Sequence, residues 1–141
     1  MTRSSAAVAE RRPSGVLDTR TYIDLAELEP ATLPATPELT AVTLAELQQG
    51  VAMAKDALGR AARLEILTAA VAEFDPLPFD AAAASRYGTL VALTVAAKRD
   101  PRPRRPGLMI AAIASAHDLP LYTRNTADFR GLESAVEVIG V

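Results

Sequence analysis

The chain has 141 residues, of which 50% are hydrophobic and 23% are charged, and its formal net charge is −2. A chain of this length suits one domain that can bury a sizeable core without disulfides. It contains no cysteine, no tryptophan and one histidine, which excludes zinc fingers, iron–sulfur clusters, thiol nucleophiles and a two-histidine metal site. The glycines form neither a dinucleotide-binding fingerprint nor a P-loop. Carboxylates, hydroxyls and arginines remain to carry chemistry.

The N-terminal segment and the apolar runs indicate a soluble, cytoplasmic protein. Residues 1–13 are polar and alanine-rich, and Glu10, Arg11 and Arg12 stand where a signal peptide requires an apolar stretch. The longest uncharged apolar run, 87–97, is about half as long as the ~18–20 residues of a membrane helix. We therefore expect a flexible leader over 1–13, one domain over 14–141 and no membrane partner.

Short strands and helices alternate along the chain. Apolar runs predict strands over 14–18, 38–42, 119–123 and 136–141. Apolar residues at three- and four-residue steps predict helices over 19–28, 43–71, 79–98 and 108–117, the second divided or kinked at Gly50 and Gly59. Prolines predict irregular segments over 29–37 and 99–106, and a turn or short edge strand over 74–78.

This order of elements predicts an α/β fold. Strands that are separated by helices imply right-handed crossovers, and therefore a parallel central sheet of four to five strands with helices on both faces. In such a sheet, ligands bind outside the carboxyl ends of the strands. Polar residues at those ends are accordingly the candidates for function.

Three acidic residues, Asp18, Glu46 and Asp128, stand at such positions, and each also has an ordinary structural interpretation. Asp18 follows the first strand and could cap the next helix. Thr43 and Glu46 match the capping-box pattern of a helix N-terminus. Asp128 follows the 119–123 strand and could be a turn residue, as could Asn125.

Taken together, the three acids predict a metal site. Carboxylates that meet in one pocket either raise each other's pKa or bind a cation. With no cysteine and one histidine available, the cation would be Mg²⁺ or Mn²⁺, which bind through oxygen. Such an ion is suited to activating water for attack on a phosphodiester.

Four segments resemble the VapC-type toxins of the PIN-domain ribonuclease family. An opening strand ends in Asp and Thr (Val16-Leu-Asp-Thr19), and an S/T-x-x-E-L turn follows at Thr43–Leu47. An apolar stretch similar to D-L-x-I-A-A-x-A covers Leu108–Ala114, and a T-x-N-x-x-D-F loop covers Thr123–Phe129. The match runs in order from about Gly15 to Val141 and implies a PIN-like three-layer fold.

The resemblance implies the toxin of a type II toxin–antitoxin system, an endoribonuclease that depends on a divalent metal ion. Asp18, Glu46 and Asp128 carry over as metal ligands and catalytic residues, and Asn125 carries over as a supporting polar group. Asn125 and Thr19 would orient ligands and water. The implied partners are an RNA substrate, a cognate VapB-type antitoxin and a second copy of the chain, as a homodimer that forms a heterotetramer or larger assembly with the antitoxin.

One position departs from the family pattern. The residue that matches the family's third acid is Gly107, and the nearest acid, Asp100, lies seven residues earlier in a proline-rich segment. Losing a carboxylate should weaken the binding of a hard cation. Either activity persists on three carboxylates at higher metal concentration, or the chain is an attenuated or inactive PIN-fold module that binds an antitoxin without turnover.

Two further features have open interpretations. The basic run 98–105 could hold the RNA backbone through Arg102, Arg104 and Arg105, or it could be a solvated loop. The apolar stripe over 44–71 is ordinarily core. Where it is exposed, it would be the place for a partner peptide or a second subunit.

Overall fold

The computed structural model describes residues 13–141, which form four strands, five α-helices and several short 3₁₀ helices. The strands are β1 (Ser14–Leu17), β2 (Thr36–Glu38), β3 (Leu121–Thr123) and β4 (Val138–Gly140). The α-helices are α2 (Thr19–Ile23), α3 (Ala41–Ala52), α4 (Ala57–Glu73), α5 (Ala81–Ala96) and α6 (Arg105–Ala116). The 3₁₀ helices are η1 (Leu25–Glu27), η2 (Pro30–Thr32), η3 (Arg102–Arg104) and η4 (Thr126–Phe129). Residues 1–12 of the expected leader lie outside the described residues.

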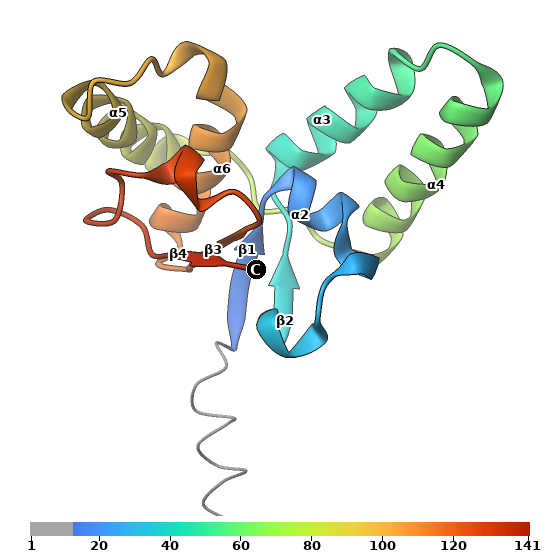
Figure 1. The fold of residues 1–141 in the computed structure, drawn as a ribbon, viewed down its shortest axis with the longest axis horizontal. Coiled ribbons are helices and arrows are strands. Elements are labelled where there is room, and N and C mark those ends of the chain that lie inside the picture. Colours follow the sequence, from blue (N-terminus) through green and yellow to red (C-terminus); the bar gives the residue numbers. More distant parts are fainter. Residues whose placement is uncertain (1–12) are drawn as a thin grey trace, which may run out of the picture.

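The strands form one parallel sheet in the order β2-β1-β3-β4, which confirms the predicted sheet (Figure 1). The register of the two central strands pairs Val16 with Leu121 and Leu17 with Tyr122. Because both strands run in the same direction, the segments that follow Leu17 and Thr123 leave the sheet at the same edge. The first and last thirds of the chain therefore meet there.

Side chains alternate between two apolar layers on the two faces of this sheet. Val16 and Leu121 belong to the cluster that includes Leu90 of α5 and Leu108 of α6. The next residue of each strand, Leu17 and Tyr122, points to the cluster formed with α2, α3 and α4. Helices α5 and α6 lie on one side in Figure 1 and helices α3 and α4 on the other. The predicted three-layer α/β architecture is confirmed.

The second strand and the helix after it begin earlier than predicted. Strand β2 covers 36–38 rather than 38–42, and Thr40 is already the N-cap of α3. Pro37 is tolerated in β2 because this is an edge strand, where one backbone N–H is not needed for pairing. The segment 74–78 contributes only an isolated bridge between Leu77 and Thr40.

The apolar stripe over 44–71 folds into two helices that pack on each other. The break lies between Ala52 and Ala57, so Gly50 and Gly59, the predicted dividing points, both lie inside helices. Asp56 caps α4, because its Oδ1 accepts a 2.6 Å hydrogen bond from the N–H of Gly59. Part of the stripe is exposed rather than core: Leu58, Leu64 and Val71 are 83%, 48% and 58% exposed.

Two other boundaries differ from the prediction. The expected helix over 19–28 ends as an α-helix at Ile23 and continues as η1, before the proline at position 30. The segment 99–106, expected to be irregular, contains η3 and the start of α6. Pro106 lies in the first turn of α6, where a missing N–H costs no intrahelical hydrogen bond.

Candidate active site

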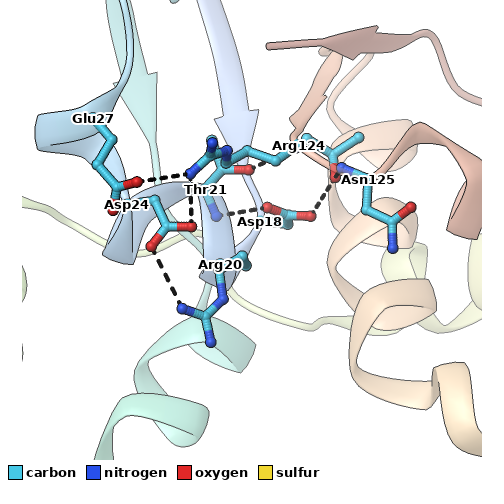
Figure 2. A network of polar contacts seen from close by, with 8 residues as sticks. Asp18, Arg20, Thr21, Asp24, Glu27, Arg124 and Asn125 are labelled. Atoms are coloured by element: carbon cyan, nitrogen blue, oxygen red, sulfur yellow. Dashed lines mark hydrogen bonds and ion pairs between the residues drawn. The ribbon is translucent and has the colours of Figure 1, made fainter.

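Asp18 lies where β1 ends and is held from two directions. Its Oδ1 accepts a 3.0 Å hydrogen bond from the N–H of Thr21, so the residue does cap α2. Its Oδ2 accepts a 2.6 Å hydrogen bond from the hydroxyl of Thr123, at the end of β3 (Figure 2). The structural interpretation of Asp18 is therefore correct, but it accounts for only one of the two carboxylate oxygens.

The hydroxyl of Thr123 also joins Asp18 to Asn125. The backbone N–H of Asn125 donates a 3.0 Å hydrogen bond to Thr123 Oγ1. Thr123 is fully buried, so its hydroxyl relies on these protein partners. Thr123 is not among the predicted site residues, although this residue opens the T-x-N-x-x-D-F loop. A buried threonine that ends a central strand is the signal that could have found it.

Glu46 faces the start of α2 instead of capping its own helix. The hydroxyl of Thr19 donates a 2.5 Å hydrogen bond to Glu46 Oε1, and it lies 3.0 Å from the hydroxyl of Thr43. The N-cap of α3 is Thr40, which accepts a hydrogen bond from the N–H of Thr43. The capping-box interpretation of Thr43 and Glu46 is therefore wrong, and Glu46 is oriented by Thr19.

Glu46 and Asp128 both line a cavity of about 310 Å³. Gly107 and Arg104 also line this cavity, whereas Asp18 does not. Within residues 13–141, no group of three acidic or histidine side chains is arranged to hold a metal ion. The structure thus places two of the predicted acids, Glu46 and Asp128, on one cavity. Asp18 is linked to this cavity only through the adjacent residue Thr19, which donates to Glu46.

Gly107 lies in the first turn of α6, beside the ring of Phe129. A Cβ atom added there would lie 3.4 Å from Phe129 Cζ, an ordinary van der Waals contact. The backbone of Gly107 therefore leaves room for a side chain on the wall of this cavity. The carboxylate that the family pattern has at this position could be accommodated with little change.

Comparison with known proteins decides the family. No family model matches the chain. Ribonuclease VapC5 from Mycobacterium tuberculosis strain H37Rv is 38% identical over 133 residues, which cover 91% of this chain and 96% of that protein. The chain belongs to the VapC family of PIN-domain ribonucleases.

Solved structures agree with the VapC assignment. The crystal structure of VapBC-5 from M. tuberculosis, a member of the VapBC family of toxin–antitoxin systems, has a TM-score of 0.81 and 38% identity, covering 92% of this chain and 99% of that one. FitAcB from Neisseria gonorrhoeae has a TM-score of 0.66 and 25% identity, covering 89% and 96%. The fold of this VapC chain is thus similar to those chains over nearly its whole length.

The arginines near the cavity of this VapC chain have different surroundings. Arg102 donates from Nε and Nη2 to the two carboxylate oxygens of Asp100, both at 3.1 Å, and these bonds lower the pKa of Asp100. Arg104 lines the cavity, and its Nη1 donates to the carbonyl oxygen of Asp100 at 2.9 Å. Arg105 is exposed and does not line the cavity.

Two arginines outside the predicted set connect the loop after β3 to the rest of the domain. Arg99 Nη1 donates a 2.7 Å hydrogen bond to the carbonyl oxygen of Ala127, the residue before Asp128. Arg124 Nη1 lies 3.0 Å from an oxygen of Asp24 and 3.5 Å from one of Glu27 (Figure 2). Because these contacts bridge distant segments, sequence patterns alone did not indicate them.

The residues on the cavity suit a divalent cation. Mg²⁺ prefers oxygen ligands and is often bound by one or two carboxylates together with substrate phosphates. Glu46 and Asp128 supply two carboxylates on one cavity, which also includes a cationic side chain, Arg104.

Of the helices in the described part of the chain, none has both the length and the apolar character that crossing a bilayer requires.

Proposed function

We propose that this VapC-family chain is the toxin of a type II toxin–antitoxin system and cleaves RNA phosphodiester bonds as an endoribonuclease with Mg²⁺ or Mn²⁺. The observation that carries the proposal is the pairing of Glu46 and Asp128 on one cavity at the carboxyl edge of the parallel sheet. The relative at 38% identity is called a ribonuclease, which supports the same activity. RNA is therefore the proposed class of substrate.

Glu46 and Asp128 would hold the cation, and Asp18 would complete its ligands from the end of β1. When bound, the divalent ion would lower the pKa of a water molecule and stabilise negative charge on the phosphate. Asp18 and Glu46 keep free lone pairs for this task, because each described carboxylate oxygen accepts one hydrogen bond at most.

Two neighbouring hydroxyls orient Glu46 and Asp18. Thr19 fixes one oxygen of Glu46, and Thr123 fixes one oxygen of Asp18. Asn125 follows Thr123 and is exposed, so its amide group is available to water or to substrate. Outer partners of this kind set the orientation of metal ligands.

The basic residues Arg102, Arg104 and Arg105 would hold the RNA backbone, since arginine binds phosphate through paired N–H groups. The segment that carries them, η3 and the start of α6, reaches the cavity through Pro103 and Arg104. Their positive charges offset the repulsion between the acidic residues of the cavity and the RNA phosphates.

A cognate VapB-type antitoxin is the proposed protein partner, with a homodimer of this chain in a heterotetramer or larger assembly. VapBC-5, the similar solved structure, is described as a member of a toxin–antitoxin family. The side chains of Leu58, Leu64 and Val71 on α4 are apolar and exposed, and the antitoxin could cover them. Binding of the antitoxin would then limit the activity of the nuclease.

An RNA cleavage assay with increasing Mn²⁺ tests this function. We expect metal-dependent cleavage by the unaltered protein, lowered by more than about 100-fold in Glu46→Gln and Asp128→Asn, because metal stabilisation of the reacting phosphate is worth several kcal/mol. Glu29→Gln, which changes an exposed acid outside the cavity, is the matched control and should retain activity.

Two outcomes would contradict the proposal. Cleavage that Glu46→Gln and Asp128→Asn leave unchanged would remove these acids from the catalytic site. Cleavage that appears only in Gly107→Asp would show that the natural chain is catalytically inactive and would favour the alternative of a PIN-fold module without turnover.

A further inference from the structure

The side-chain hydroxyl of Thr43 is not used to cap its own helix. Thr40 caps α3, and its Oγ1 accepts the N–H of Thr43. A helical threonine commonly binds the carbonyl oxygen four residues earlier, but here that oxygen, on Leu39, accepts the N–H of Leu77 at 2.9 Å. Thr43 is fully buried, so its hydroxyl requires a partner in the protein. Within residues 13–141, that partner is Thr19 Oγ1, at 3.0 Å.

The direction of these hydrogen bonds follows from the number of protons available. An ionised carboxylate only accepts, so Thr19 gives its single hydroxyl proton to Glu46 Oε1. Thr19 then has no proton for Thr43, and the bond between the two hydroxyls is donated by Thr43. The result is a hydroxyl relay, from Thr43 through Thr19 to Glu46. Both ends of the relay lie on one face of α3, because residues three apart are neighbours on a helix.

The hydroxyl relay fixes one carboxylate oxygen of Glu46 and leaves the other available. Oε1 is bound by Thr19, whereas Oε2 accepts no hydrogen bond from residues 13–141. Hydrogen bonds in series polarise one another, so the bond from Thr43 strengthens the bond from Thr19 to Glu46. It also restrains the rotation of the Thr19 hydroxyl. Thr43 therefore acts on Glu46 through a residue of another helix.

From this relay we infer that Thr43 is a positioning residue of the candidate metal site. Its hydroxyl keeps the proton of Thr19 on Glu46 Oε1 and thereby leaves Oε2 to a divalent cation. The inference rests on the proposed function for the cation that Glu46 would bind. It gives the T-x-x-E spacing a function other than capping, since the threonine orients the glutamate one turn later.

Calorimetric titration of the protein with Mn²⁺, without RNA, tests this inference. Thr43→Val keeps the shape of the side chain and should weaken Mn²⁺ binding roughly tenfold, as the loss of an outer partner of a metal ligand does. Thr43→Ser keeps the hydroxyl and should restore most of this affinity. Far-UV circular dichroism checks that each variant is folded, and Thr43→Ala replaces Thr43→Val if the latter does not fold.

Thr94→Val is the matched control for the loss of a buried hydroxyl. Thr94 is also buried in a helix, but its hydroxyl donates to the carbonyl oxygen of Leu90 in the same helix, at 2.8 Å. This variant should therefore leave the affinity for Mn²⁺ unchanged. Thr19→Val breaks the relay at its middle residue, so adding Thr43→Val to Thr19→Val should change the affinity by less than about twofold.

A comparison in the metal-free protein tests the relay independently of Mn²⁺. Urea denaturation of Thr43→Val, Glu46→Gln and the double variant gives three changes in the folding equilibrium constant. Because the relay couples the two residues, the double change should differ from the product of the single changes by more than about threefold. Thr94→Val combined with Glu46→Gln should match the product within about twofold.

Several outcomes decide between the inference and its alternatives. Unchanged Mn²⁺ affinity in Thr43→Val, or no recovery in Thr43→Ser, would overturn the inference. If Mn²⁺ did not bind at all, the proposed function would fail, and the metal-free comparison would decide alone whether Thr43 positions Glu46. If Mn²⁺ binding depends on Thr43 but RNA is not cleaved, the proposed nuclease fails and this inference stands. Metal-dependent cleavage with an Mn²⁺ affinity that Thr43→Val leaves unchanged gives the reverse.

Discussion

Among single residues, Thr123 joins two parts of the candidate site. It donates to Asp18 Oδ2 at 2.6 Å and accepts from the N–H of Asn125 at 3.0 Å, and it is fully buried. One hydroxyl therefore fixes both a proposed metal ligand and the start of the loop that carries Asp128. Replacing it should affect stability and activity together.

Thr123→Val keeps the shape of the side chain but leaves an oxygen of Asp18 and the N–H of Asn125 without this partner. We expect the free energy of unfolding to fall by about 1–3 kcal/mol, the cost of an unsatisfied buried polar group. Urea denaturation measures this change. Thr36→Val, at an exposed position of β2, is the control and should differ little from the unaltered protein. Equal stability of both variants would contradict the assigned role of Thr123.

The site residues could be predicted from the sequence only where they belong to a local motif. Asp18, Glu46 and Asp128 each stand in a short pattern after a strand or at the start of a helix. The partners that orient them were not found: Thr123 lies 105 residues from Asp18, and Arg99 lies 28 residues from Ala127. Such contacts depend on which strands are adjacent, which a single sequence does not show.

Among the elements, α3 shows how a one-turn difference in the start of a helix changes the function of a residue. The sequence contains two threonines three residues apart, Thr40 and Thr43, and either could cap. The bridge between Thr40 and Leu77 keeps residue 40 extended, so the helix begins at Ala41. Thr43 and Glu46 then lie inside the helix and face Thr19. Tertiary packing, which the motif does not encode, decided between the two caps.

Thr40→Ala tests this assignment. Loss of the cap should lower the free energy of unfolding by about 1 kcal/mol, and thermal or urea denaturation measures it. Thr40→Ser keeps the capping oxygen and should recover most of the loss. If Thr40→Ser were as destabilising as Thr40→Ala, the hydroxyl would not be the cap.

For the molecule as a whole, the overall architecture was predictable, because alternating strands and helices permit few parallel arrangements. Element ends were less predictable: β2 lies two residues before its expected start, and 99–106 contains η3 and the first residues of α6. Both differences involve prolines that occupy an edge strand or a first helical turn, where proline is compatible with regular structure.

Stability at high pH reports on the packing of α2 against α4. Tyr22 is buried, packs edge-on against Phe74 at 5.6 Å, and its pKa is raised by burial and by the charge of Glu73. The folded protein therefore keeps the phenol proton at pH values where the unfolded chain loses it. Stability from this group is present below the unfolded tyrosine pKa of about 10 and is lost as pH rises through the higher folded value.

Tyr22→Phe should accordingly flatten the fall in stability at alkaline pH. Urea denaturation at a series of pH values measures the slope, with Tyr87→Phe, which pairs with Phe79 on the other side of the sheet, as the control. An unchanged slope in Tyr22→Phe would show that burial of Tyr22 does not govern the alkaline behaviour.

The hydrogen bond between Asp18 and Thr123 has a consequence for the synthesis of the protein. Its two residues are separated by 105 positions, so a nascent chain that has already exposed its first strand lacks the partner that completes the site. Since folding proceeds from the N-terminus as the ribosome releases the chain, the assembled arrangement can form only near the end of translation. Truncated products would carry Asp18 and Glu46 but no working nuclease.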